Sequence, residues 1–174
     1  SSVTKTVNAY RLASSSFNYP LHLGVTEAGT LYSGTIKSSI AIGALLLDGI
    51  GDTIRVSLTS NPVDEIKAAK EILSSINLYD KPEIISCPTC GRCQYDMFTI
   101  TNEIDNFLNN LKTNKKIKVA IMGCVVNGPG EAREADIGVA GGDGCGVIFK
   151  NGEVLKKVNE NEIVDELLKE IEKI

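Results

Sequence analysis

The sequence of 174 residues has no tryptophan, a single histidine and only 5% aromatic residues. This scarcity argues against a surface for stacking nucleic-acid bases, because such surfaces are built from aromatic side chains. Basic residues are not in excess either, since the net charge is −4 at pH 7. The lysines and arginines are scattered rather than gathered in a stripe, so the attraction to phosphate backbones is missing. We therefore predict no nucleic-acid partner.

Long apolar runs are also missing, and no stretch approaches the roughly 20 residues that a membrane-spanning helix needs. We predict no membrane partner. The five cysteines are an odd number and fall in one third of the chain. Secreted disulfide frameworks usually have an even number of cysteines. Clustered cysteines in cytosolic proteins more often serve metal or redox chemistry, so we predict a cytoplasmic protein.

The first half of the sequence alternates between helical and strand patterns. Strands are predicted where apolar and polar residues alternate, and helices where apolar residues recur at helical spacing. Asn61 and Pro62 are typical of a helix start. The β-α-β-α order is that of a parallel sheet or a β/α barrel. The expected helices are 6–17, 35–51 and 61–77, and the expected strands are 20–26 and 52–60.

The pattern changes near residues 77–82, where we place a linker between a domain at 1–80 and a small α+β domain at 81–174. The Asn151-Gly152 pair predicts a hairpin with a type I′ turn. The expected strands are 83–86, 117–123, 135–141 and the hairpin 146–158, and the expected helices start near residues 96 and 163.

The stretch SCPTCGRC places Cys87 and Cys90 three residues apart, after a predicted strand. Such a pair can form a redox disulfide in a dithiol protein, or bind a metal. A zinc site in a zinc-stabilised binding module needs four ligands. Cys124 is a third candidate and Cys93 a fourth, although Cys93 competes with its neighbours for the same space.

An iron–sulfur cluster is the other possibility for these thiols, since clusters also accept ligands other than cysteine. Glu131 follows Cys124 by seven residues, across the stretch Gly128-Pro129-Gly130. This stretch is expected to fold the chain back so that Glu131 approaches the same cluster. A carboxylate would leave one iron with a replaceable ligand, as metal catalysis requires. An ordinary solvated loop glutamate is the alternative.

A second group of polar residues follows the barrel pattern. Arg55 and Ser57 occupy the face of their strand opposite the aliphatic residues, and in a barrel they would point into the lumen, where arginine binds phosphate. Glu27 comes directly after the preceding strand, where barrel enzymes place catalytic groups. Lys37 lies near a helix start, a natural anion site. The hydroxyls of Ser33, Ser38 and Ser39 lie there too.

The strings HLGVTEAG, GIGDTIRVSL, CPTCGR and GCVVNGPGEA together resemble the 4-hydroxy-3-methylbut-2-enyl diphosphate synthase family, four-iron, four-sulfur enzymes of the non-mevalonate isoprenoid pathway. The resemblance runs from about Tyr19 to Phe149. It implies α/β plus α+β architecture: the last two β/α units of a TIM-type barrel, then an iron–sulfur domain resembling sulfite reductase domains. Family members are about twice this length, so the chain is expected to be a C-terminal fragment that does not turn over alone.

The resemblance also implies an activity, the two-electron reductive conversion of 2-C-methyl-D-erythritol 2,4-cyclodiphosphate to 4-hydroxy-3-methylbut-2-enyl diphosphate. Flavodoxin or ferredoxin would supply the electrons, and the protein would be a homodimer. The ligands of the 4Fe-4S cluster would be Cys87, Cys90, Cys124 and Glu131.

The remaining family residues fall in the barrel. The resemblance places the catalytic glutamate at Glu27 and the diphosphate-binding residues at Arg55 and Ser57. Cys93 and Cys145 have no ligand role in the family pattern and are predicted to be free thiols.

Overall fold

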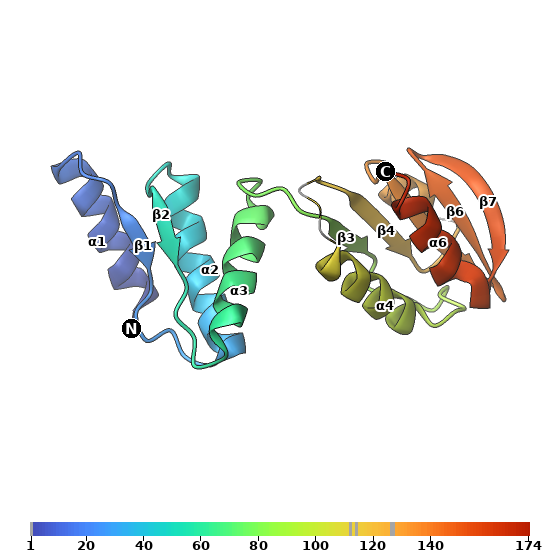
Figure 1. Ribbon diagram of the computed structural model, residues 1–174, viewed down its shortest axis with the longest axis horizontal. Helices are drawn as coiled ribbons and strands as arrows, with labels where there is room; N and C mark the ends of the chain where they lie inside the picture. Colours follow the sequence, from blue (N-terminus) through green and yellow to red (C-terminus); the bar gives the residue numbers. More distant parts are fainter. Residues whose placement is uncertain (1, 112, 114, 126–127) are drawn as a thin grey trace. The chain divides into compact units, whose positions relative to one another are not determined.

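The computed structural model describes residues 2–111, 113, 115–125 and 128–174, with the backbone alone at positions 129 and 131. The chain divides into two compact units, Ser1–Tyr79 and Asp80–Ile174 (Figure 1). Each unit has its own hydrophobic core and is described by itself. No helix in the described ranges is both long and apolar enough to cross a membrane.

The first unit alternates helices with two short strands. Strands β1 and β2 pair in parallel, as the sequence predicted (Figure 1). In the observed register Leu23 lies opposite Ile54. Both strands are shorter than predicted, and beyond them the pairing continues as one isolated bridge between Thr30 and Thr59. The elements are α1 (Val3–Ser16), β1 (His22–Gly24), α2 (Leu31–Leu47), β2 (Thr53–Arg55) and α3 (Pro62–Ser75).

Helix α3 begins where the sequence predicted, because the Asn61 side chain accepts a hydrogen bond from the Val63 N–H at 3.0 Å. Its apolar stripe is only partly buried. Ile72 and Ala68 enter the core, whereas Val63 and Ile66 are each 59% exposed. The apolar stripe of α3 is therefore buried towards the C-terminal end of the helix and exposed near its start.

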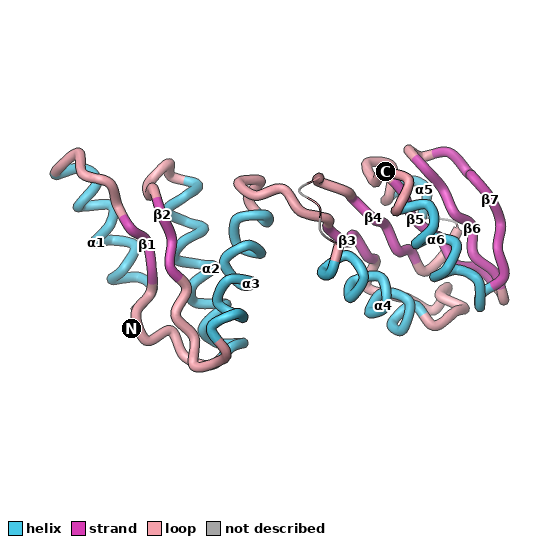
Figure 2. The backbone as a smooth tube through the Cα atoms, in the orientation of Figure 1, coloured by secondary structure: helices cyan, strands magenta, loops and turns pink. Residues whose placement is uncertain are grey.

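The second unit is built on a five-stranded sheet with the order β3-β4-β5-β6-β7 (Figure 2). Strands β3, β4 and β5 pair in parallel, whereas β6 pairs antiparallel with β5 and with β7. The elements are β3 (Glu83–Ser86), α4 (Met97–Asn110), β4 (Lys118–Met122), α5 (Gly128–Glu131), β5 (Ile137–Gly142), β6 (Cys145–Lys150), β7 (Glu153–Asn159), the 3₁₀ turn Glu160–Glu162 and α6 (Ile163–Ile171).

Both faces of this sheet are covered. Helices α4 and α6 pack on one face, where Ile104 and Leu167 are fully buried against Val119 and its neighbours. The segment around α5 packs on the other face, against Phe149 and the alanines of β4 and β5. Because β4 and β5 are covered on both sides, they are almost wholly apolar after Lys118, whereas β3 is only partly buried.

The β6–β7 hairpin turns where the sequence predicted. Asn151 has φ 50° and Gly152 has φ 81°, the left-handed conformations that a type I′ turn requires. The register shifts between Ile148 and Phe149, which marks an irregularity in the ladder. The prediction from the Asn-Gly pair is therefore confirmed.

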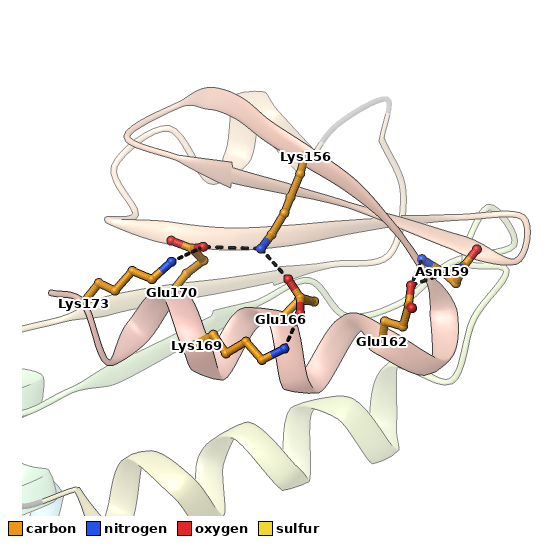
Figure 3. A network of polar contacts seen from close by, with 7 residues as sticks. All are labelled: Lys156, Asn159, Glu162, Glu166, Lys169, Glu170 and Lys173. Carbon is orange, nitrogen blue, oxygen red and sulfur yellow. Dashed lines mark hydrogen bonds and ion pairs between the residues drawn. The ribbon is translucent and has the colours of Figure 1, made fainter.

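A network of charged side chains joins α6 to β7 (Figure 3). Lys156 of β7 contacts Glu166 at 2.5 Å and Glu170 at 3.3 Å. Lys169 of α6 contacts Glu166 at 2.6 Å, and Lys173, just beyond the end of α6, contacts Glu170 at 2.7 Å. Hydrogen bonds from Lys156 first, and then from Lys169, lower the pKa of Glu166 to about 2. The Glu166 hydrogen bond is also the main cause that raises the pKa of Lys156.

Acid is expected to weaken the second unit as pH falls from 4.5 towards about 2. A carboxyl whose pKa is lower in the folded state stabilises the fold above its ordinary value, here 4.5, and this contribution is lost as pH falls through about 2. Lys156 acts at the other end of the scale, because its raised pKa adds stability that is lost only above 10.5.

Urea denaturation measured across the acid range tests this expectation. Glu166→Gln should flatten the acid limb, and added salt should do the same because these charges are close to solvent. An acid limb that is identical in Glu166→Gln and in the unchanged chain would show that the network does not cause it.

Candidate functional site

The carboxyl ends of β1 and β2 bring the predicted barrel residues together. Gly24 lies opposite Arg55 in the parallel pair, and a side chain at Gly24 would come within 3.1 Å of the Arg55 Nε. The missing side chain lets Arg55 cross β1, where its Nη2 donates a hydrogen bond to Thr26 Oγ1 at 3.1 Å. Glu27 is the next residue along the chain, so Arg55 and Glu27 belong to the same edge of the sheet.

Glu27 has a backbone conformation that glutamate seldom adopts. Its φ of 54° lies in the left-handed region, and its side chain is exposed while the following Ala28 is fully buried. Such conformations persist only where the surroundings fix them, and they gather at functional sites. Ser57 lies two residues beyond Arg55 and is half-buried, whereas Val56, between them, is buried in the core.

Two residues of α2, Ser33 and Lys37, lie close to Gly29 in the loop that follows β1. A side chain at Gly29 would lie 3.6 Å from Ser33 Oγ and 4.0 Å from Lys37 Nζ. Ser39 instead donates its hydroxyl to the Thr35 carbonyl at 2.7 Å, within its own helix. Ser38 is fully buried, and its hydroxyl has no hydrogen-bond partner among the described atoms. Of the four residues of the predicted anion site, Lys37 and Ser33 therefore lie beside Gly29, whereas Ser38 is buried and Ser39 bonds within its own helix.

A cavity of about 300 Å³ in the first unit lies at the opposite edge. Its lining includes Leu21 and Asp52, which precede β1 and β2. The amino-terminal face of a barrel serves stability rather than catalysis. We therefore place the candidate site at the carboxyl edge.

The second unit brings two cysteine loops to one edge of its sheet. Strands β3 and β4 are parallel and end at Ser86 and Met122, so the residues that follow emerge side by side. The Gly123 N–H donates a hydrogen bond to Cys87 Sγ at 3.1 Å, and the Cys87 N–H donates to the Ile121 carbonyl at 3.3 Å. Cys124 follows Gly123 directly.

Cys93 lies closer to the contact between Gly123 and Cys87 than the sequence indicated. A side chain at Gly123 would lie 3.3 Å from both Cys87 Sγ and Cys93 Sγ. Cys90 is exposed, and its carbonyl accepts the Cys93 N–H at 2.9 Å. All five cysteines are free thiols. No three side chains of histidine, cysteine, aspartate or glutamate within the described ranges gather closely enough to hold a metal ion.

The backbone of Gly128–Glu131 forms the short helix α5, where the sequence predicted only a chain reversal. The Gly128 N–H donates to the Cys124 carbonyl at 3.0 Å, and α5 then runs to Glu131. A side chain at Gly128 would lie 2.7 Å from the Ala140 Cβ, so glycine lets this turn lie against β5. The side chain of Glu131 lies outside the described part of the structure, and its predicted role stays a prediction.

Tyr95 is a residue of this site that sequence analysis missed. It is 9% exposed, and its hydroxyl donates a hydrogen bond to the Met122 carbonyl at 2.9 Å. Burial raises its pKa, and the nearby Cys93 and Cys87 raise it further. The tyrosine lies two residues after Cys93, but sequence spacing alone could not show that its hydroxyl reaches β4.

A cleft of about 200 Å³ opens beside Cys87. Its lining carries no charged side chain: Ser86, Cys87, Pro88, Thr89, Met97, Phe98, Thr101 and Asn102. An anionic group would find no counter-charge among these residues. The cationic groups expected to bind phosphate belong to the first unit.

The chemistry of the donors fits an iron–sulfur cluster. Cys87 receives an N–H hydrogen bond, which suits an electron-rich sulfur, and the loop of Cys124 lies against it. Thiolates are the ligands that such clusters prefer. The resemblance names Cys87, Cys90 and Cys124 as the residues that would hold it, with Glu131 as the fourth.

Comparison with known proteins covers both units. The model of the GcpE TIM-barrel domain matches residues 1–70, and that of the GcpE protein C-terminal domain matches residues 83–173. A protein of Clostridium acetobutylicum is 62% identical over 173 residues, which are 99% of this chain and 49% of that protein. One of Clostridium perfringens is 61% identical over 175 residues, 100% of this chain and 50% of that protein.

A third relative, from Geobacter sulfurreducens, is 55% identical over 175 residues, 100% of this chain and 49% of that protein. All three are named 4-hydroxy-3-methylbut-2-en-1-yl diphosphate synthase (flavodoxin). The chain spans about half the length of the curated relatives it matches. The family matches cover both β/α units and the cysteine loops, which confirms the resemblance seen in the sequence: the chain belongs to the GcpE family.

Proposed function

We propose that this chain is part of an iron–sulfur enzyme that reduces 2-C-methyl-D-erythritol 2,4-cyclodiphosphate to 4-hydroxy-3-methylbut-2-enyl diphosphate. Two electrons and two protons enter, the ring C–O bond to phosphate breaks, and one hydroxyl leaves as water. The family membership supports the activity class. The observation that carries the cluster proposal is the Gly123 hydrogen bond to Cys87, because it joins the two loops that hold the expected ligands.

Each group of residues has a separate task in this proposal. Cys87, Cys90 and Cys124 hold the 4Fe-4S cluster, which would deliver electrons to the substrate when bound. Glu131 is the replaceable ligand, because a carboxylate binds iron less strongly than a thiolate does. The other three ligands would be thiolates, which keep the cluster in place.

The first unit binds and orients the substrate. Arg55 and Ser57 would bind its diphosphate, and the Thr26 hydrogen bond fixes the direction of the guanidinium. Glu27 would hold or deliver a proton at the reacting oxygen. Its position at the end of β1 supports this role, since barrel enzymes keep catalytic groups there.

Several further features belong to the same proposal. The name of the relatives, which includes flavodoxin, supports reduced flavodoxin as the electron donor, with ferredoxin as the alternative. We propose a cytoplasmic homodimer whose C-terminal half, residues 81–174, resembles sulfite reductase domains and whose residues 1–80 form the end of a barrel. The 174 residues alone should not turn over, because most of the diphosphate pocket would come from the rest of a full-length protein.

Metal and sulfide analysis after anaerobic purification tests the proposal. Iron with acid-labile sulfide, together with turnover of the cyclic diphosphate by a full-length protein carrying this chain, is the expected result. One zinc without sulfide would favour a zinc-stabilised module instead. A reversible Cys87–Cys90 disulfide without metal would favour a dithiol redox protein.

Replacing Glu131 in such a full-length protein is expected to separate cluster binding from turnover. Glu131→Cys adds a fourth thiolate, so iron content should hold while activity falls by roughly 10- to 100-fold, the range seen when groups around a metal change. Glu131→Ala should lower the iron content. Normal iron content, spectrum and turnover in Glu131→Ala would make Glu131 an ordinary loop residue.

A further inference from the structure

The peptide group between Met122 and Gly123 is held at both of its ends. Its carbonyl oxygen accepts the Tyr95 hydroxyl at 2.9 Å, and its N–H donates to Cys87 Sγ at 3.1 Å. The carbonyl and the N–H of a trans peptide lie in one plane and point in opposite directions. A partner that fixes the direction of the oxygen therefore also fixes the direction of the N–H.

Close packing holds Tyr95 in this place. A side chain at Gly141 would come within 1.9 Å of the Tyr95 Cε1 and 2.0 Å of its Cδ1. The ring therefore lies directly on the backbone of β5, at a position that no other residue type would leave open. The tyrosine carbonyl also contacts Cys93 Sγ at 3.5 Å, which joins the end of the cysteine loop to the same structure.

The surroundings of Gly123 are also close-packed. A side chain at Gly123 would lie 3.3 Å from Cys87 Sγ and 3.2 Å from the Cys93 Cβ, so the two cysteines leave little room there. The hydroxyl that bonds the carbonyl also polarises the peptide and strengthens its N–H as a donor. Tyr95 is thus connected to the Cys87 sulfur through one rigid group.

We propose that Tyr95 is a positioning residue that holds the Met122–Gly123 peptide with its N–H directed at Cys87 Sγ. The inference rests on the proposed function in one respect, that this sulfur binds iron. A hydrogen bond to a ligand sulfur stabilises the more negative, reduced state of a cluster, and such bonds are among the factors that set its reduction potential. Tyr95 would then tune the potential without touching the cluster.

Tyr95→Phe tests the inference, because it removes the hydroxyl and keeps the ring on Gly141. The matched control is Tyr32→Phe, at a side chain that is 80% exposed. In the metal-free chain, the exchange rate of the Gly123 amide proton should rise roughly tenfold in Tyr95→Phe, about the effect of losing one hydrogen bond. Exchange of the Val119 and Val139 amides, within the same sheet, should stay unchanged in both variants.

The second readout is the reduction potential of the reconstituted cluster. Tyr95→Phe should shift it to a lower value by up to about 59 mV, the equivalent of a tenfold change for one electron. Iron content should be unchanged, and Tyr32→Phe should match the unchanged chain in every measurement.

Three outcomes would overturn the inference. Unchanged Gly123 exchange in Tyr95→Phe would show that the hydroxyl does not hold the peptide. Equal acceleration of Gly123, Val119 and Val139 would reduce Tyr95 to a general packing residue. Faster Gly123 exchange with an unchanged potential would remove the effect on the cluster. Failure to bind iron and sulfide in the unchanged chain would contradict the proposed function instead, and the exchange measurement would still decide the role of Tyr95.

Discussion

Serine in place of Cys87 is expected to remove nearly all iron and sulfide from the anaerobically reconstituted chain, whereas serine in place of Cys93 should leave both unchanged. The two sulfurs lie equally close to Gly123, but their partners differ. Cys87 Sγ accepts an N–H hydrogen bond, which suits an electron-rich ligand, and its other contact is Met97 Sδ at 3.9 Å, a weak acceptor. Cys93 Sγ lies 3.5 Å from the Tyr95 carbonyl oxygen, a contact that suits the S–H of a free thiol.

The expected loss is large because three thiolates and one weak carboxylate leave no spare ligand. Changing a group that only supports a metal ligand costs 10- to 100-fold in affinity, so losing the ligand itself should cost at least about 100-fold. Cys145→Ser is the matched control, at the other cysteine that is predicted to have no ligand role. Equal loss of iron in Cys93→Ser and Cys87→Ser would place Cys93 among the ligands and overturn the assignment.

Gly138→Ala is expected to destabilise the second unit by about 3 kcal/mol, the upper end of the usual cost of over-packing. The new Cβ would lie 2.4 Å from the Phe149 Cζ and 2.6 Å from the Ala120 carbonyl oxygen. The phenylalanine ring is fully buried and the carbonyl belongs to the neighbouring strand, so neither can move without disturbing the sheet.

Urea denaturation followed by circular dichroism would measure this loss. Gly91→Ala is the matched control, because a side chain at Gly91 meets no atom within 4 Å, and its stability should stay within about 0.5 kcal/mol. Unchanged stability in Gly138→Ala would mean that Phe149 does not pack on β5 as described.

Local patterns in the sequence predicted most of the secondary structure. Helix starts such as Asn61 and the Asn151-Gly152 turn were predicted correctly because capping and turn geometry depend on neighbouring residues. The exposure of Val63 could not be predicted, because helical spacing shows which residues share a face but not how far the core extends along it.

The candidate site was predicted less completely. Parallel strands explain why the loops of Cys87 and Cys124 meet, and the spacing of their motifs indicated this. The closeness of Cys93 and the bond from Tyr95 to Met122 depend on contacts between residues distant in the chain. Such contacts arise from packing, and no spacing rule in a single sequence contains them.

The change from parallel to antiparallel pairing at β5 has a consequence for folding kinetics. The β6–β7 hairpin joins neighbouring segments through a two-residue turn. Strands β3 and β4 can pair only after the long segment between them, which contains α4, has brought them together. Pairings between distant segments form more slowly, because the entropy of loop closure is lost before the contacts compensate for it. We therefore expect the edge that carries Cys87 and Cys124 to assemble last, after the antiparallel half of the sheet has formed.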